Sequence, residues 1–334
     1  LILLQVPIFH LALSILSGSA EVESSASVYL NVRIWGAPAT LASYVLMGVL
    51  IGLGKSKTLL VVQLVLNGLN IVLDVVFAGF FGMGVAGIAL GTLIAEWSAC
   101  LFALSLVLRT LKERQQDNEA FWSWARISNT QQLTRTLGVQ GNIMIRTLSL
   151  LFGFGWFTQQ GAKLGDVTLA ANHILLQFIS FSAFFLDGIA HATEALVGKA
   201  AGARNVDVFT ILIRRTMKLA AFLALALGFI FFIFGNLAVS VLTDIDEVKV
   251  AALKTLPFAA FYIAVSFGTF QLDGIFIGTT RTQEMRNAGL ISLALYLAIG
   301  WPLVNAYGNT GLWLAFISFI LLRAASLMLY YPKL

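Results

Sequence analysis

The sequence predicts an all-α polytopic membrane protein made of two pseudo-symmetric six-helix bundles, the first of which is truncated at its N-terminus. Three observations predict this fold: a composition too apolar for a soluble protein, repeated apolar segments, and an internal repeat. Hydrophobic residues make up 59% of the 334 residues and charged residues only 11%, against about 25% charged in ordinary globular proteins. Most of the surface must therefore face lipid.

The apolar segments have the length of membrane-spanning helices, which need roughly 20 mostly apolar residues. Segments without Asp, Glu, Lys or Arg cover residues 34–54, 167–186, 219–243 and 255–272. Allowing single buried charges adds 58–79, 85–108 and 136–158, and extends 167–186 to 198 and 255–272 to 278. The stretch 287–322 is too long for one helix and breaks at the turn-forming cluster 305–311. We therefore expect nine complete helices and a partial helix at residues 1–17.

Basic residues lie mostly on one side of the predicted membrane. The other side carries only four of the 21 Lys and Arg residues: Arg33, Lys163, Lys249 and Lys254. The positive-inside rule makes the basic side cytoplasmic, together with the C-terminus and the polar segment 109–135. The net charge of +5 then reflects membrane topology, and no nucleic-acid partner is expected.

The polar segment 109–135 links a first lobe (1–108) to a second lobe (136–334). Residues 48–52 (GVLIG) resemble residues 274–278 (GIFIG) at an offset of 226, which also pairs Gly82 with Gly308 and Glu21 with Glu247. Both copies keep the same orientation, as in transporters built from parallel repeats. By this register the first lobe lacks two and a half helices, and we expect a parent protein with twelve.

Polar side chains recur at helical spacing inside the predicted spans, where ionisable groups are costly and indicate function. Helix 58–79 carries Gln63, Asn67, Asn70 and Asp74 on one face. Three more stripes follow in the second lobe: Asn142, Arg146 and Ser149; His173, Gln177, Ser180, Asp187, His191 and Glu194; and Tyr262, Ser266, Thr269 and Asp273. The stripes predict a wet interior lined from both lobes. The alternative is hydrogen bonding that only holds the bundle together.

These residues divide into two sets of expected roles. We assign cation or proton coupling to Asn70, Asp74, Asp187, His191, Glu194 and Asp273, because a carboxyl group buried in the membrane can bind and release a proton and His191 can relay it. The expected substrate cavity contains Gln63, Asn67, Arg146, Gln177 and Tyr262. Arg146 is either an ion-pair partner of these acids or a substrate ligand, whereas Glu96, alone among apolar neighbours, is expected to be structural.

Several segments resemble one transporter family: RIWGAPA at 33–39, NIVLDV at 70–75, LDG at 186–188 running on to 204, and LDGIFIG at 272–278 followed by TR and EMRN. The chain is similar to the multidrug and toxic compound extrusion (MATE) family, and most to its DinF (DNA-damage-inducible protein F) branch. The resemblance implies two six-helix bundles that export organic solutes, often cationic or amphipathic, in exchange for H⁺ or Na⁺. It also implies that Asn70 and Asp74 help to form the first-lobe cation site, whereas the family's first-helix acid has no counterpart here.

We therefore expect a multidrug or organic-cation efflux antiporter, driven by inward H⁺ or Na⁺ flow and working by alternating access between the lobes. It is expected to be a monomer in the bacterial inner membrane, with small organic substrates and lipid as partners and with neither a cofactor nor a bound metal. The alternative is a lipid-linked oligosaccharide flippase, which would need several basic residues in its cavity, where only Arg146 clearly qualifies. An enzyme is not expected, because the sequence has neither a DDxxD nor an HExxH motif.

Overall fold

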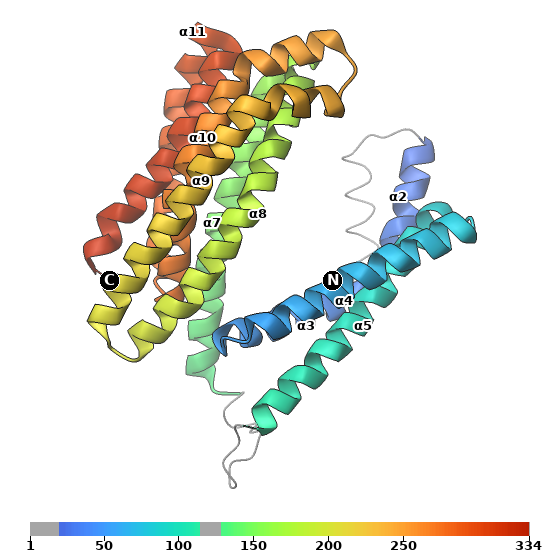
Figure 1. Cartoon of the computed structure of the whole chain (residues 1–334), viewed down its shortest axis with the longest axis vertical. Helices are drawn as coiled ribbons and strands as arrows, with labels where there is room; N and C mark the ends of the chain where they lie inside the picture. Colours follow the sequence, from blue (N-terminus) through green and yellow to red (C-terminus); the bar gives the residue numbers. More distant parts are fainter. Residues whose placement is uncertain (1–19, 114–127, 334) are drawn as a thin grey trace. The chain divides into compact units, whose positions relative to one another are not determined.

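A computed structural model describes residues 20–113 and 128–333 of the chain. The described residues form helices joined by short turns, and the chain divides into two compact units, Leu1–Ser123 and Trp124–Leu334 (Figure 1). The predicted partial helix at 1–17 lies outside the described residues, as does the middle of the predicted linker. The two units are described separately below.

The first unit is built around one long helix, α5. Its elements are α2 (Ala20–Arg33), the 3-10 turn η2 (Ile34–Gly36), α3 (Ala37–Gly52), α4 (Ser56–Asp74), the π-helix η3 (Val75–Phe80) and α5 (Gly84–Lys112). Helix α5 packs against α2, α3 and α4. A small apolar core of Leu50, Val62, Ala103 and Val107 joins α3, α4 and α5.

Residues 20–33 correct the sequence-based expectation of a loop before residue 34. They form α2, which continues through η2 into α3, so that one candidate span covers Ser24–Gly52. Its N-terminal part is rich in Ser and contains Arg33, which lowers its hydropathy and hides it from a search for uncharged segments. The charge of Arg33 is instead accommodated by an ion pair with Glu96 on α5.

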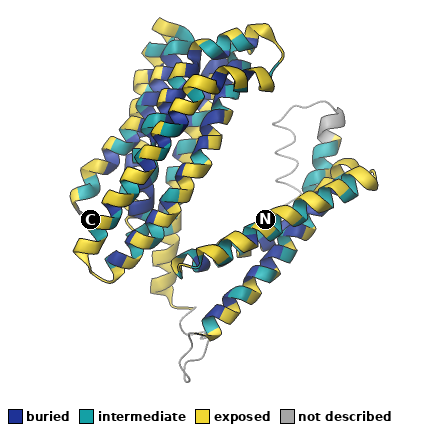
Figure 2. Cartoon of the chain, in the orientation of Figure 1, coloured by how far each residue is buried: buried dark blue, intermediate teal, exposed yellow. Residues whose placement is uncertain are grey.

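The second unit is a helical bundle with α10 at its centre. Its elements are α7 (Thr130–Lys163), α8 (Asp166–Gly202), α9 (Val206–Leu242), α10 (Asp246–Gly278), α11 (Thr282–Tyr330) and the short η4 (Tyr331–Lys333). Helix α10 packs against α8, α9 and α11. Aromatic side chains fill the core, where Phe157, Tyr296, Trp313 and Phe316 are fully buried. Buried positions run along the helices of this unit between exposed ones (Figure 2).

Helix α11 consists of two helical segments that meet at Gly308, where φ is 57° and ψ is −131°. The break falls inside the turn-forming cluster 305–311, as the sequence predicts. The side-chain oxygen of Asn172 on α8 accepts hydrogen bonds from Asn309 at 3.0 Å and from the Trp313 indole at 2.9 Å. This network fastens the kink of α11 to α8.

Backbone geometry in the two units reproduces the repeat at an offset of 226. Helices α3 and α10 end at Gly52 and Gly278, and α4 and α11 begin at Ser56 and Thr282. In the turn between each pair, Gly54 and Thr280 adopt φ of 69° and 59°. The turns share the same three backbone hydrogen bonds, Leu53–Val49, Gly54–Ile51 and Lys55–Leu50 in one copy and Thr279–Ile275, Thr280–Ile277 and Arg281–Phe276 in the other. These two turns match at the register read from the sequence, and the same turn also joins α8 to α9 around Arg204, so it is not specific to the repeat.

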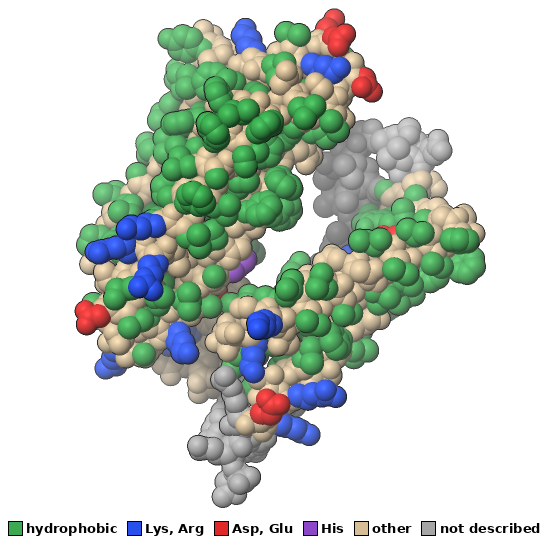
Figure 3. All heavy atoms as spheres, in the orientation of Figure 1, with side chains coloured by type: hydrophobic (Ala, Val, Ile, Leu, Met, Phe, Trp, Pro, Cys, Tyr) green, Lys and Arg blue, Asp and Glu red, His purple; other side chains and the backbone are tan. Residues whose placement is uncertain are grey.

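Eight of the described helical segments are long and apolar enough to cross a membrane, and the kinked α11 counts as one of them. Hydrophobic side chains cover much of the flank of the second unit, and charged side chains gather toward its ends (Figure 3). Phe222, Phe229 and Leu237 on α9 are all strongly exposed, which is costly in water and favourable in lipid. The chain is therefore a multi-pass membrane protein.

Candidate functional site

The polar face of α4 runs along the first unit and starts with two amide side chains. Gln63 Nε2 lies 2.7 Å from the sulfur of Met47 on α3, and Asn67 Nδ2 donates to the backbone oxygen of Gln63 at 2.9 Å. Gln63 is half-buried and Asn67 is exposed. Both amides are thus anchored on their own helix or on α3, at a distance of two to three turns from Asp74 along α4.

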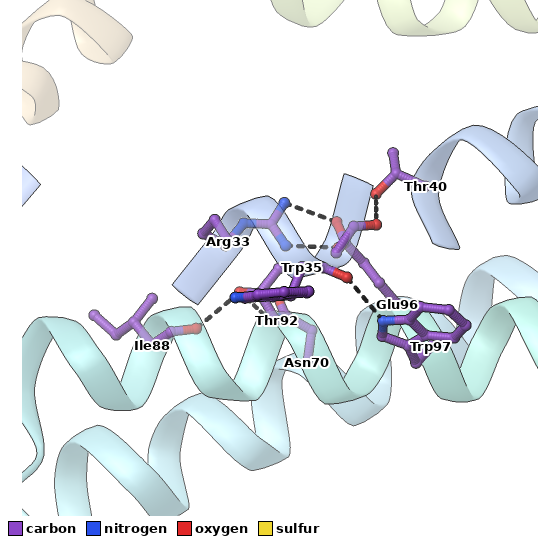
Figure 4. Close-up of polar contacts among 9 residues, drawn as sticks. Arg33, Trp35, Thr40, Asn70, Ile88, Thr92, Glu96 and Trp97 are labelled. Atoms are coloured by element: carbon purple, nitrogen blue, oxygen red, sulfur yellow. Dashed lines mark hydrogen bonds and ion pairs between the residues drawn. The ribbon is translucent and has the colours of Figure 1, made fainter. Parts of the chain in front are cut away.

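Asn70 connects α4 to α5. Its Nδ2 donates to Thr92 Oγ1 at 3.0 Å, and the Thr92 hydroxyl donates to the backbone oxygen of Ile88 at 2.9 Å (Figure 4). Because Thr92 gives its only proton to Ile88, its oxygen must act as the acceptor toward Asn70. Within residues 20–113 and 128–333, the side-chain oxygen of Asn70 makes no such contact with Thr92.

Asp74 lies one turn beyond Asn70, at the residue where α4 changes into the π-helix η3. Its Oδ1 is buried and has no hydrogen-bond partner among the described residues. The oxygen lies against Gly91 of α5, where any Cβ would collide with it. A buried carboxylate oxygen without a partner is costly unless it binds a proton or a cation. Short π-helical segments inside α-helices are frequent at functional sites.

Glu96 lies one turn from Thr92 on α5 and belongs to an ion pair that the sequence did not predict (Figure 4). Both terminal nitrogens of Arg33 donate to its carboxylate, at 2.6 and 2.8 Å. The indole of Trp97 adds a 3.0 Å hydrogen bond to the backbone oxygen of Trp35 in η2. Together these contacts hold the 3-10 turn between α2 and α3 against α5.

A cavity of about 340 Å³ lies inside the second unit, between α7, α8, α10 and α11. Six of the predicted site residues line it: Arg146, Asp187, His191, Glu194, Tyr262 and Asp273. They come from α7, α8 and α10, so part of each of the three polar stripes of this lobe faces one cavity. The ring of Tyr262 is buried and stacks on Phe316, with ring centroids 4.7 Å apart.

Asp273 lies between two arginines at this cavity. Its Oδ2 accepts from Arg146 of α7 and, at 2.9 Å, from Arg323 of α11. Of the two roles that the sequence left open for Arg146, the structure shows the ion pair. Arg323 was not among the predicted site residues, although a lone arginine in an otherwise apolar helix is itself a signal of function.

The acids of α8 differ from Asp273 in their surroundings. Asp187 is exposed in the cavity lining. His191 Nδ1 lies 3.5 Å from a carboxylate oxygen of Glu194, and 63% of the His191 side chain is exposed. Because these side chains are more exposed than Asp273, which is paired with two arginines, their charged forms lose less hydration when they exchange protons or bind cations.

Gln177 and His173 lie outside this cavity. Their side chains approach each other to 3.3 Å on an exposed face of α8. Gln177 instead lines an apolar hollow between α8 and α9 together with Phe181, Phe231 and Phe234. Helical periodicity placed both residues on the stripe, but their distance along α8 carries them beyond the cavity.

Glycines bring α8 and α10 close together beside the cavity. A Cβ on Gly274 would lie 2.5 Å from the backbone oxygen of Ala190, and one on Gly278 would lie 2.6 Å from that of Glu194. Small residues of this kind let membrane helices pack backbone against backbone. The close packing fixes the acids of α8 relative to Asp273.

Comparisons with known proteins agree on one family. The MatE family profile matches residues 1–76 and 143–301. DNA damage-inducible protein F of Escherichia coli is 35% identical over 329 residues, which is 97% of this chain and 70% of that protein. A probable multidrug resistance protein NorM of Mannheimia succiniciproducens is 25% identical over 91% of this chain and 67% of its own length. The Arabidopsis thaliana protein DETOXIFICATION 43 is 25% identical, and this chain spans 55% of its length.

Solved transporter structures share the fold. The Vibrio cholerae MATE transporter VcmN in its bent form superposes with a TM-score of 0.85 at 19% identity, over 99% of this chain and 75% of that one. An outward-facing multidrug resistance MATE family transporter gives a TM-score of 0.84 at 19% identity, over 99% of this chain and 76% of that one.

Proposed function

Because the chain belongs to the MatE family of membrane transporters, we propose that it exports small, often cationic or amphipathic organic compounds in exchange for H⁺ or Na⁺. Inward ion flow drives the export, by alternating access between the two lobes. The protein works in the bacterial inner membrane, with the inter-lobe linker and the C-terminus in the cytoplasm. It is a transporter and not an enzyme.

The observation that carries the proposal is the buried carboxylate oxygen of Asp74, which has no hydrogen-bond partner among the described residues. A proton or a cation would satisfy it, and Asn70, one turn before Asp74 on α4, is the nearest polar side chain of the stripe on the same helix face. One proton that crosses the membrane supplies about 1.4 kcal/mol per pH unit and about 2.3 kcal/mol per 100 mV. Each pH unit alone is enough to concentrate a solute about tenfold.

The acids Asp187 and Glu194, which are not paired with an arginine in the described part of the chain, give the second-unit cavity a matching chemistry for organic cations. One observation favours the alternative function, a lipid-linked oligosaccharide flippase. Arg323 lies beside Arg146 in the lining of this cavity, and a flippase needs several basic residues there. Both arginines, however, are neutralised in part by Asp273. The two functions can be distinguished by testing whether transport depends on an ion gradient, because an antiporter requires an ion gradient.

The test is efflux of a cationic dye from proteoliposomes that contain the intact protein, under a pH gradient or a Na⁺ gradient. We expect gradient-driven efflux for the unmodified protein and loss of coupling in Asp74→Asn, which keeps the shape of the side chain but removes its charge. Asp207→Asn, at the exposed start of α9, is the control and should transport normally. Efflux that ignores both gradients would exclude the antiporter, and normal coupled efflux in Asp74→Asn would exclude this site.

A further inference from the structure

A second pocket, of about 500 Å³, lies at the end of the second unit where two interhelical turns meet. The turn between α8 and α9 contributes Arg204 and Asn205 to its lining, and the turn between α10 and α11 contributes Thr279 and Arg281. Tyr331 of η4 also lines it. Two guanidinium groups from different helix pairs therefore border one hollow.

The surroundings of this pocket are rich in positive charge. None of the described residues that line it is acidic. Residues 199–218 contain five basic residues and one acid, the exposed Asp207 in the first turn of α9. Glu284 pairs with Arg281 at 3.4 Å, yet half of the Arg281 side chain is exposed. Figure 3 shows Lys and Arg side chains gathered over the end of the unit where α8 meets α9. Basic groups thus outnumber acids around the pocket, which favours an anion.

Arg204 has an unusual backbone conformation for an arginine. Its φ of 54° lies in the left-handed region, which glycine adopts most readily. The same turn has Gly54 at this position in the first unit and Thr280 between α10 and α11. Residues in strained conformations are concentrated at functional sites. An arginine where glycine would be unstrained indicates a role for its side chain.

The position of the pocket along the membrane helices corresponds to the lipid headgroups. The predicted apolar segments 255–278 and 287–322 lie within six residues of Arg281. Six residues of helix span about 9 Å, which is close to the thickness of one headgroup layer. Val206 and Phe209 of α9 line the pocket beside the arginines, and Val206 is strongly exposed. Basic pockets between membrane helices at this depth suit lipid phosphates, and the apolar flank of the helices suits the acyl chains.

We propose that this pocket binds the phosphate group of an anionic phospholipid through Arg204 and Arg281. Arginine forks bind phosphate through paired hydrogen bonds. Helices α9 and α11 begin directly after Asn205 and Arg281, and the positive ends of their dipoles add to the attraction. The bound phosphate links the two turns of the bundle. Lipid binding goes beyond the proposed export and is measured without transport, so its failure leaves the export function standing.

The experiment compares binding of dioleoylphosphatidylglycerol and dioleoylphosphatidylcholine to the purified, delipidated intact protein by native mass spectrometry. The two lipids have the same acyl chains, but only the first has a net negative charge. We expect the first phosphatidylglycerol molecule to bind at least roughly tenfold more tightly than phosphatidylcholine, since each basic residue near an anionic lipid contributes roughly fivefold. Arg204→Gln and Arg281→Gln should each lower this preference roughly fivefold, and the double variant should lower it by roughly tenfold or more. Phosphatidylcholine binding should be unchanged.

The control variant Lys55→Gln with Lys57→Gln removes two basic residues at the turn between α3 and α4, where Lys55 is the counterpart of Arg281 at the offset of 226. It should keep the preference for phosphatidylglycerol. Glycerol phosphate, which has no acyl chains, should not displace the lipid, and displacement would overturn the proposal by showing a site for soluble phosphates. Equal affinity of the unmodified protein for the two lipids would also overturn it, as would an equal loss of preference in the lysine and arginine double variants.

Discussion

At the scale of single residues, the charged side chains of the membrane helices differ in how fully they are paired. Arg33 and Glu96 form a two-point ion pair, and Asp273 is held between Arg146 and Arg323. Asp74 alone among these acids keeps a buried oxygen without a partner in the described part of the chain. Full pairing indicates a structural task, whereas the open oxygen indicates an exchangeable proton or cation.

The Arg33–Glu96 pair should contribute to stability through its geometry. Removing one partner leaves the other charge in an apolar surrounding and lowers the free energy of unfolding. The Arg33 and Glu96 side chains are 24% and 13% exposed. We therefore expect a loss of about 3 kcal/mol, at the low end of the range for breaking a buried ion pair. Arg33→Gln and Glu96→Gln should therefore each lower the melting temperature in detergent by several degrees. The exchanged pair Arg33→Glu with Glu96→Arg should recover part of the loss, whereas melting that is unchanged in both single variants would show that the pair is not stabilising.

The sequence predicted these residues unevenly. The cost of burying acids in apolar helices, together with their helical spacing, led us to expect Asp74, Asp187 and Asp273 as site residues. The partners Arg33 and Arg323 lie 63 and 50 residues from Glu96 and Asp273 along the chain. Such pairings depend on how helices pack, and helical periodicity within one segment carries no information about the facing helix.

At the scale of helices, most spans were predictable because hydropathy and length determine them. The exception is the start of the span Ser24–Gly52, where serines and Arg33 lower the hydropathy. The break of α11 at Gly308 was also predictable, since Asn and Gly cluster there. The 3-10 turn η2 and the π-helix η3 were not, because their residues are ordinary apolar ones. These departures from α-helical geometry depend on packing against α5, with which both elements are in contact.

The repeated turn at Gly54 and Thr280 gives a prediction about backbone strain. Both residues adopt left-handed φ values, which are strained for a β-branched residue. Gly54→Thr should therefore destabilise the protein by about 1–2 kcal/mol. The same substitution at Gly48, which lies inside α3 at ordinary φ with open space beside it, is the control and should cost much less.

Thermal unfolding of both variants in the same detergent checks the comparison. The reverse substitution Thr280→Gly should be neutral or slightly stabilising, because it relieves the strain at the other copy of the turn. Equal destabilisation by Thr at positions 48 and 54 would contradict the role given to the left-handed turn.

At the scale of the whole molecule, the sequence predicted a division into two helical halves, and the structure has two compact units that meet in sequence between Ser123 and Trp124. The units share a turn and two helix ends at the offset of 226. The proposed site residues lie in both units: Asn70 and Asp74 in the first, and the residues of the charged cavity in the second. Transport by the proposed mechanism requires that ion binding in one unit and substrate binding change together.

Ion and substrate counterflow tests that requirement most directly. Proteoliposomes that contain the intact protein are given a substrate gradient and no ion gradient, and substrate movement is recorded together with luminal pH and with uptake of radioactive sodium. We predict that H⁺ or Na⁺ moves against the substrate in the unmodified protein, and that this ion movement is lost in Asp74→Asn. Substrate that crosses the membrane with no opposite movement of either ion would contradict the account.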